Sequence, residues 1–92
     1  MTMTERAAAL RLPNPSCEED LESRWSTVLR YGDRILVSGY VHNPDGKSWI
    51  AAVYEFLNPG ETDCEDPIGI RAISDERYED AGHAIAWCLQ HD

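Results

Sequence analysis

A chain of 92 residues, 42% of them hydrophobic, can build one modest core, and it has no apolar run near the ~20 residues of a membrane-spanning helix. Seventeen acidic side chains oppose eight basic ones, for a net charge of −9, and Lys47 is the sole lysine. Such a surface repels phosphate backbones and anionic lipids, so direct binding to nucleic acid or to a membrane is disfavoured.

The negative charge is concentrated in the second part of the chain. Residues 1–34 carry six acids and five bases, for a net charge of −1, whereas residues 35–92 carry eleven acids and three bases, for −8. Acidity also serves solubility in many proteins. Charge therefore points to a class of partner only if the fold gathers the acids on one surface.

The cysteines and the N-terminus predict a cytoplasmic protein. Cys17, Cys64 and Cys88 form an odd and sparse set, which predicts reduced thiols instead of a disulfide framework. The N-terminus lacks the basic start and the long apolar centre of a signal peptide.

The first fifteen residues predict a flexible arm. Thr4 is a candidate N-cap for a short helix, but a helix of about two turns is not stable alone. Pro13 and Pro15 prevent it from continuing. We expect residues 1–15 to be an arm and residues 16–92 to form a single α+β domain.

Residues 16–31 fit two different patterns. Ser16 and Glu19 have the spacing of a capping box, and Gly32 stands where a helix C-cap belongs. An apolar stripe at helical spacing follows the box, formed by Cys17, Leu21, Trp25, Val28 and Leu29. A strand over 24–30 is the competing interpretation, because Trp25, Thr27, Leu29 and Tyr31 alternate along the chain. We favour the helix, since the capping box and the glycine agree with the helical spacing.

A β-hairpin follows, and its turn is the clearest local signal in the chain. Strands over 34–42 and 47–57 flank Asn43-Pro44-Asp45-Gly46, in which the proline suits a type I turn and Gly46 supplies the positive φ of a bulge. Both faces of these strands carry apolar residues. After an exposed loop, a short third strand is predicted over 68–73.

The last predicted element is a helix over about 76–90, with Ser74 and Asp75 as its cap. Its buried stripe comprises Tyr78, Ala81, Ile85, Cys88 and Leu89. At about 100° per residue, Trp87 falls opposite that stripe. The chain is thus expected to be α+β, a three-stranded antiparallel sheet with two helices on one face, in the order α-β-β-β-α.

Metal and catalytic motifs are missing from the sequence. No C-x2–4-C or H-x3–5-H pair exists to begin a zinc site, and no phosphate-binding loop or nucleophile elbow is present. Cys64 is flanked by Asp63 and Glu65, which disfavour the thiolate that a nucleophile needs. We therefore predict no cofactor, no bound metal and no enzymatic activity.

The acids form three runs, at 18–22, 61–66 and 75–80, which hold twelve of the seventeen. Two of the runs start predicted helices, where complementing the helix dipole contributes only ~0.3–1 kcal/mol per charge. The predicted partner-binding surface joins the second and third runs to the aromatic side chain, and consists of Glu61, Asp63, Glu65, Asp66, Asp75, Glu76, Glu79, Asp80 and Trp87.

The leading functional prediction is a non-catalytic acidic protein that binds and inhibits a basic, nucleic-acid-handling partner. Such a protein would resemble nucleic acid in charge, in the manner of inhibitors from phages or mobile elements or of immunity proteins. One alternative is a structural or adaptor subunit, or a homodimer, that uses a sheet face around Tyr40, Trp49 and Tyr54. Another is a small ligand-binding domain or enzyme, which a pocket with His42 or His83 beside a carboxylate would favour. We expect a monomer or a weak homodimer, whereas a stable homodimer would favour the adaptor alternative.

Overall fold

The computed structural model describes residues 2–57 and 66–90. In chain order, its elements are the helix α1 (Met3–Ala9), the 3₁₀ turn η1 (Glu18–Asp20), the helix α2 (Leu21–Arg24), the strands β1 (Thr27–Tyr31), β2 (Arg34–Tyr40), β3 (Trp49–Phe56) and β4 (Ile68–Ile73), and the helix α3 (Ala81–Gln90). The strands form one antiparallel sheet in the order β1-β2-β3-β4.

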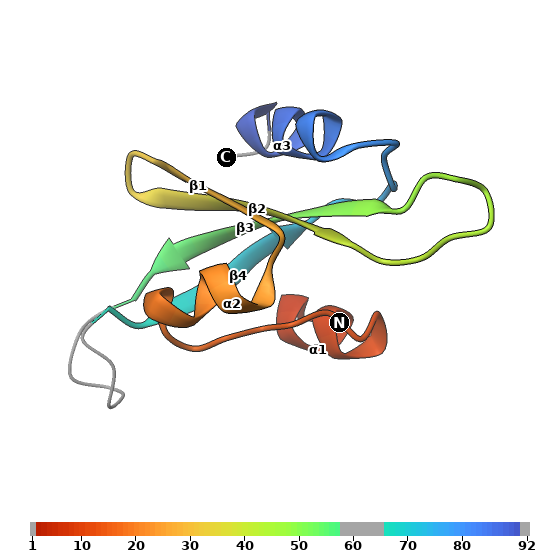
Figure 1. Ribbon diagram of the computed structural model, residues 1–92. Coiled ribbons are helices and arrows are strands. Elements are labelled where there is room, and N and C mark those ends of the chain that lie inside the picture. The colour runs from red at the N-terminus through yellow and green to blue at the C-terminus, as the bar shows by residue number, and fades with distance from the viewer. Residues whose placement is uncertain (1, 58–65, 91–92) are drawn as a thin grey trace.

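The fold is α+β, but the predicted arrangement of a three-stranded sheet with both helices on one face is wrong. The described sheet has four strands. Helices α1 and α2 cover one face of it, and α3 lies against the other (Figure 1). The sheet is therefore the central layer, with helices packed against both of its faces. None of the described helices combines the length and the apolar character needed to cross a bilayer.

The missed strand is β1, which lies where the helical pattern was preferred. The helix ends at Arg24, and Trp25 already has an extended backbone with ψ of 145°. Gly32 has φ of +60° and belongs to the tight turn between β1 and β2, in which Tyr31 pairs with Arg34. The capping box does not form, because Cys17 is the N-cap of η1 and makes no side-chain capping bond.

The predicted hairpin is confirmed. Gly46 has φ of +85°, and its amide donates to the Asn43 carbonyl at 3.0 Å. In β2, the consecutive residues Ile35, Leu36 and Val37 are all completely buried. Since neighbouring strand residues point to opposite faces, this run requires cover on both sides of the sheet.

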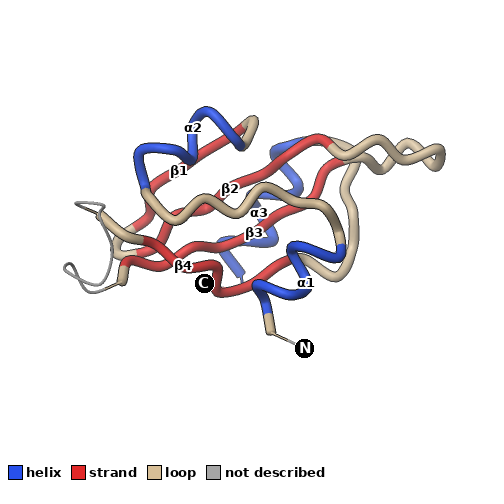
Figure 2. Tube along the Cα trace, turned by 90° about the horizontal axis from the view of Figure 1, so that it is seen from below, coloured by secondary structure: helices blue, strands red, loops and turns tan. Residues whose placement is uncertain are grey.

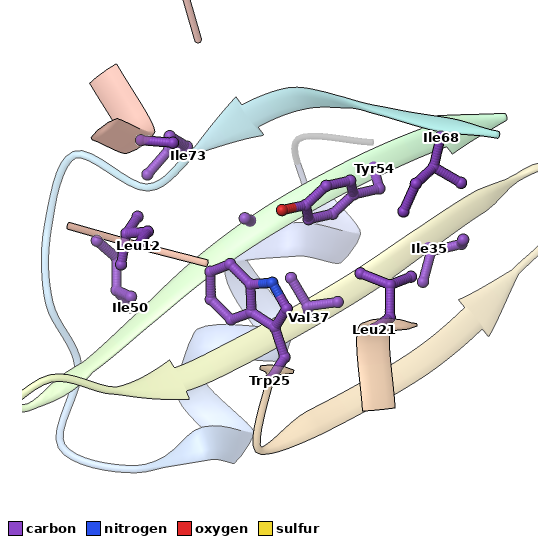
Figure 3. Close-up of a cluster of buried hydrophobic side chains, with 11 residues drawn as sticks. Leu12, Leu21, Trp25, Ile35, Val37, Ile50, Tyr54, Ile68 and Ile73 are labelled. Atoms are coloured by element: carbon purple, nitrogen blue, oxygen red, sulfur yellow. The ribbon is translucent and has the colours of Figure 1, made fainter. Parts of the chain in front are cut away.

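The larger core lies between the sheet and the two N-terminal helices (Figure 3). Trp25 contacts Tyr54 edge-on, with ring centroids 6.3 Å apart. The Tyr54 hydroxyl donates to the Pro13 carbonyl at 3.2 Å. Leu21 and Trp25, which the predicted stripe included, are buried here. The predicted helix was wrong at its start, where the capping box is absent, and from Trp25 onward, where the chain is extended.

The smaller core lies under α3. Buried Ala84 and Cys88 face Leu36, Ala51 and Val53 of the sheet, and the small residues allow the helix to approach the strands closely. The Cys88 thiol is buried and donates to the Ala52 carbonyl at 3.4 Å. This helix begins at Ala81 and not at residue 76.

Cys17 is disulfide-bonded, so the prediction of reduced thiols is wrong for this residue. Cys64 lies outside the described residues.

The N-terminal segment, predicted as a flexible arm, lies against the sheet. Ala7 and Leu12 are buried in the larger core. The guanidinium of Arg6 donates to the carbonyls of Ile73 and Ser74, at 3.1 and 2.9 Å. The first helix therefore covers the end of β4.

Candidate functional site

The third acidic run, residues 75–80, lies between β4 and α3 and is not helical. Trp49 and Tyr78 exchange two backbone hydrogen bonds, of 3.0 and 2.7 Å, which hold the segment beside the start of β3. The four acids of the run are exposed: Asp75, Glu76, Glu79 and Asp80. They are therefore presented from a segment that the sheet fixes in place.

Asp80 is the N-cap of α3. Its Oδ1 accepts a hydrogen bond from the His83 amide at 2.8 Å and lies 2.8 Å from His83 Nδ1. The backbone N–H of His83, followed by its side chain, holds the pKa of the Asp80 carboxyl below its usual value. The carboxylate form is thus favoured at the start of the helix, where negative charge also complements the helix dipole.

Asp75 is tied to the N-terminal helix. Its carboxylate lies 3.1 Å from the Arg6 guanidinium, which also binds the end of β4. The side chain of Asp75 is nonetheless 90% exposed. The ion pair therefore leaves most of this carboxylate available to a partner.

A shallow hollow of about 240 Å³ adjoins this run. It is lined by Lys47, Glu76, Arg77, Tyr78, Glu79 and His83. Arg77 Nη1 donates to the Val41 carbonyl at 3.3 Å, which holds its side chain against the loop between β2 and β3. The lining therefore mixes carboxylates with cationic groups, and His83 presents an imidazole oriented by Asp80.

Aromatic side chains border the same region. Tyr40 is 59% exposed and packs edge-on against Trp49, with ring centroids 5.8 Å apart. Burial raises the pKa of the Tyr78 phenol, and the nearby Glu76 carboxylate raises it further. Tyr54, in contrast, is fully buried in the larger core. The sheet face proposed for the adaptor alternative therefore cannot include Tyr54.

Trp87 does not lie opposite the buried face of α3, so that prediction is wrong. It is partly buried and packs against the smaller core with Trp49, Tyr78 and Ile85. Leu89, which was assigned to the buried stripe, is 47% exposed. Packing against the smaller core thus buries part of the Trp87 side chain.

The other predicted site residues are not brought together with this run. Asp66 is exposed and precedes β4, whereas Asp75 follows it. A strand of six residues spans about 20 Å, so the two carboxylates lie at opposite ends of β4. The Asp66 carbonyl accepts from the Glu18 amide at 3.0 Å, so the neighbour of Asp66 is the first acidic run. Glu61, Asp63 and Glu65 lie outside the described residues.

Several residues of this region were not predicted from the sequence. The pair of Asp80 and His83 has the i, i+3 spacing of a helix N-cap, which is a readable signal. Lys47 and Arg77 carried no such signal, because a loop and a non-helical segment bring them together. Over residues 2–57 and 66–90, no cluster of three or more His, Cys, Asp or Glu side chains could hold a metal ion.

Comparison with known proteins gives a family for the chain. Neither the search of curated proteins nor the search of solved structures found a match. A family model described as nucleotide modification associated domain 4 matches residues 12–92, a range that includes the four strands and α3. The chain therefore belongs to the nucleotide modification associated domain 4 family, Nmad4.

Proposed function

We propose that this protein is a non-catalytic acidic component of a nucleotide modification system, and that it binds and inhibits a basic, nucleic-acid-handling protein. The family description supports the setting. The net charge of −9 supports a basic partner. Such charge speeds the encounter of opposite surfaces and repels nucleic acid itself.

The observation that best supports this proposal is the acidic segment 75–80, which backbone hydrogen bonds hold beside β3. We call Asp75, Glu76, Glu79 and Asp80, together with Tyr40 and Trp49, the 75–80 surface. Its carboxylates attract a cationic partner, and its aromatic side chains provide contact area that holds the complex once formed. Inhibition follows if the basic surface of the partner that binds this protein is also the surface that binds its nucleic acid.

The test begins with capture of partners by the tagged protein in its native host. Affinity for a captured basic protein is then measured from ~50 mM to ~0.5 M salt, over which exposed charges become screened. Glu76→Gln/Glu79→Gln removes two charges while keeping the Arg6 pair and the α3 cap. We expect about tenfold weaker binding for it at low salt.

Glu5→Gln/Asp33→Asn is the matched control, because it changes the net charge equally at two exposed positions that are not part of the 75–80 surface. We expect it to change affinity less than twofold. Equal weakening by both variants, or an affinity that does not change with salt, would show that the acids of the 75–80 surface contribute only to solubility.

A second candidate function is binding of a small ligand in the hollow beside His83. Because Asp80 engages Nδ1, the tautomer with hydrogen on Nδ1 is favoured, and Nε2 is left as an acceptor. Lys47 and Arg77 line the same hollow. Its volume of about 240 Å³ falls below the ~300–1,000 Å³ of typical ligand sites, so this function ranks second. Titration with a nucleoside monophosphate, read from the NMR signals of His83 in the native protein and in Lys47→Ala, would detect it.

A further inference from the structure

The two edges of the sheet differ in how they are covered. Along β4, the Ile68 amide donates to the Ser16 carbonyl at 2.9 Å, and Arg6 binds the carbonyls at the other end. No hydrogen bond from another described element reaches the outer side of β1 in the ranges 2–57 and 66–90. The edge at β1 is therefore open to another strand.

The tight turn identifies the backbone groups at that edge. In such a hairpin, the residues flanking the turn form a hydrogen-bonded pair, here Tyr31 and Arg34. Bonding then alternates along β1. The N–H and C=O groups of Val28 and Arg30 consequently point away from β2. An added strand would bond to these two residues.

The two faces of the β1 edge differ in chemistry. On the α3 face, Leu29 and Tyr31 are 45% and 55% exposed. On the other face, α2 lies along β1 on the side of the sheet away from β4 (Figure 2). The pairing of Arg30 with Glu18 fixes η1 over the same strand. Glu18 is partly buried, and the exposed acids of η1 and α2 are Glu19, Asp20 and Glu22, which we call the acidic 19–22 cluster.

We infer that the open edge of β1 binds an extended segment of alternating apolar and basic residues from the basic partner. Main-chain bonds to Val28 and Arg30 give affinity, as in other cases of strand addition. Apolar side chains of the segment contact Leu29 and Tyr31 on one face, and its basic side chains lie beside the acidic 19–22 cluster on the other. The inference rests on the proposed function in one respect, namely that the partner is basic.

A second copy of this chain fits the edge less well. Two molecules of net charge −9 repel each other. A five-residue strand also provides little of the ~1,200–2,000 Å² that a stable protein–protein interface buries. A short peptide strand needs no such area, because hydrogen bonds to its backbone supply much of its affinity.

The test uses a fluorescein-labelled synthetic peptide of alternating valine and lysine, with fluorescence anisotropy as the measure of binding. We expect Glu19→Gln/Glu22→Gln to weaken binding about tenfold, and Leu29→Ser about fivefold. Glu76→Gln/Glu79→Gln, with the same change in charge, should alter it less than twofold. Hydrogen exchange of the Val28 and Arg30 amides should slow when the peptide is added.

Three results would overturn the inference. The first is equal weakening by both double variants, which indicates general attraction between charges. The second is binding without protection of the β1 amides. The third is protection that depends on protein concentration in the absence of peptide, which assigns the edge to a second copy. If the peptide does not bind but the affinity for a captured partner still depends on Glu76 and Glu79, this inference is wrong and the proposed function stands. If the peptide binds but no basic partner is captured, the proposed function is wrong and this inference stands.

Discussion

The Cβ that an alanine would add at Gly39 lies 2.9 Å from Cε3 of Trp25. The indole of Trp25 therefore rests directly on the backbone of β2, at a separation that no other residue type permits. This contact joins the end of α2 to the sheet, and it depends on the chain passing from helix to strand just before β1. It is also the place where a minimal substitution tests the fold.

Gly39→Ala is expected to lower the free energy of unfolding by about 1–3 kcal/mol, because the rigid indole must move or the strand must shift. Urea denaturation monitored by tryptophan fluorescence measures the change. Gly69→Ala is the control: its Cβ would meet the Leu57 side chain at 3.4 Å, an ordinary contact with an exposed residue. Its effect should stay within about 0.5 kcal/mol, and equal losses in both variants would contradict the close contact.

Arg6→Ala should destabilise the protein by about 1.5–3 kcal/mol, because two carbonyls at the end of β4 lose charge-assisted hydrogen bonds. Asp75→Ala removes only the ion pair of the same guanidinium. That carboxylate is 90% exposed, so its loss should cost at most about 1 kcal/mol. Thermal unfolding of both variants separates the two contributions. The reverse order of effects would show that the hydrogen bonds from Arg6 to the end of β4 contribute little to stability.

Tyr54 predicts a loss of stability at alkaline pH. Burial raises the pKa of its phenol from 10.0 to about 12. Between these values the unfolded chain releases the proton and the folded chain keeps it, so the free energy of unfolding falls as pH rises. The loss should be roughly 1–3 kcal/mol across this window. Tyr54→Phe should be less stable at neutral pH, since it lacks the bond to Pro13, but should lose this part of the alkaline dependence. An unchanged alkaline slope would exclude Tyr54 as its source.

Asp80 predicts a loss of stability at acid pH. Because hydrogen bonds from His83 lower its pKa from 3.8 in the folded protein, its contribution is present above that value and is lost as pH falls through the lowered one. Asp80→Asn retains a good N-cap but should abolish this acid-dependent part, seen in hydrogen exchange of α3 amides against pH. Glu79→Gln, which removes a neighbouring charge without touching the cap, should keep the dependence.

The hairpin could be predicted because its determinants are local. The residues from Asn43 to Gly46 form the turn with their own backbone, so their sequence is sufficient to identify it. The strand β1 could not, since Trp25 and Leu29 fit a helical stripe and an alternating strand equally well. Pairing of β1 with β2 resolves that ambiguity, and pairing is a tertiary interaction that overrides local preference.

The candidate site was predictable only in its charge. Composition indicated the acids, but the sequence assigned residues 76–80 to a helix that the Trp49–Tyr78 backbone pairing excludes. Asp80 acts as the cap that Ser74 and Asp75 were expected to provide. The separation of Asp66 from Asp75 by the whole of β4 depends on the fold, and no spacing along the chain reports it.

The complete burial of Ile35, Leu36 and Val37 limits how this sequence can vary. Because one strand supplies both cores, inserting a single residue into β2 would exchange the contents of its two sides. Leu36 would then face α1 and α2, and Val37 would face α3. Relatives that differ in length should therefore carry their insertions between Tyr40 and Trp49, beyond the paired part of the hairpin.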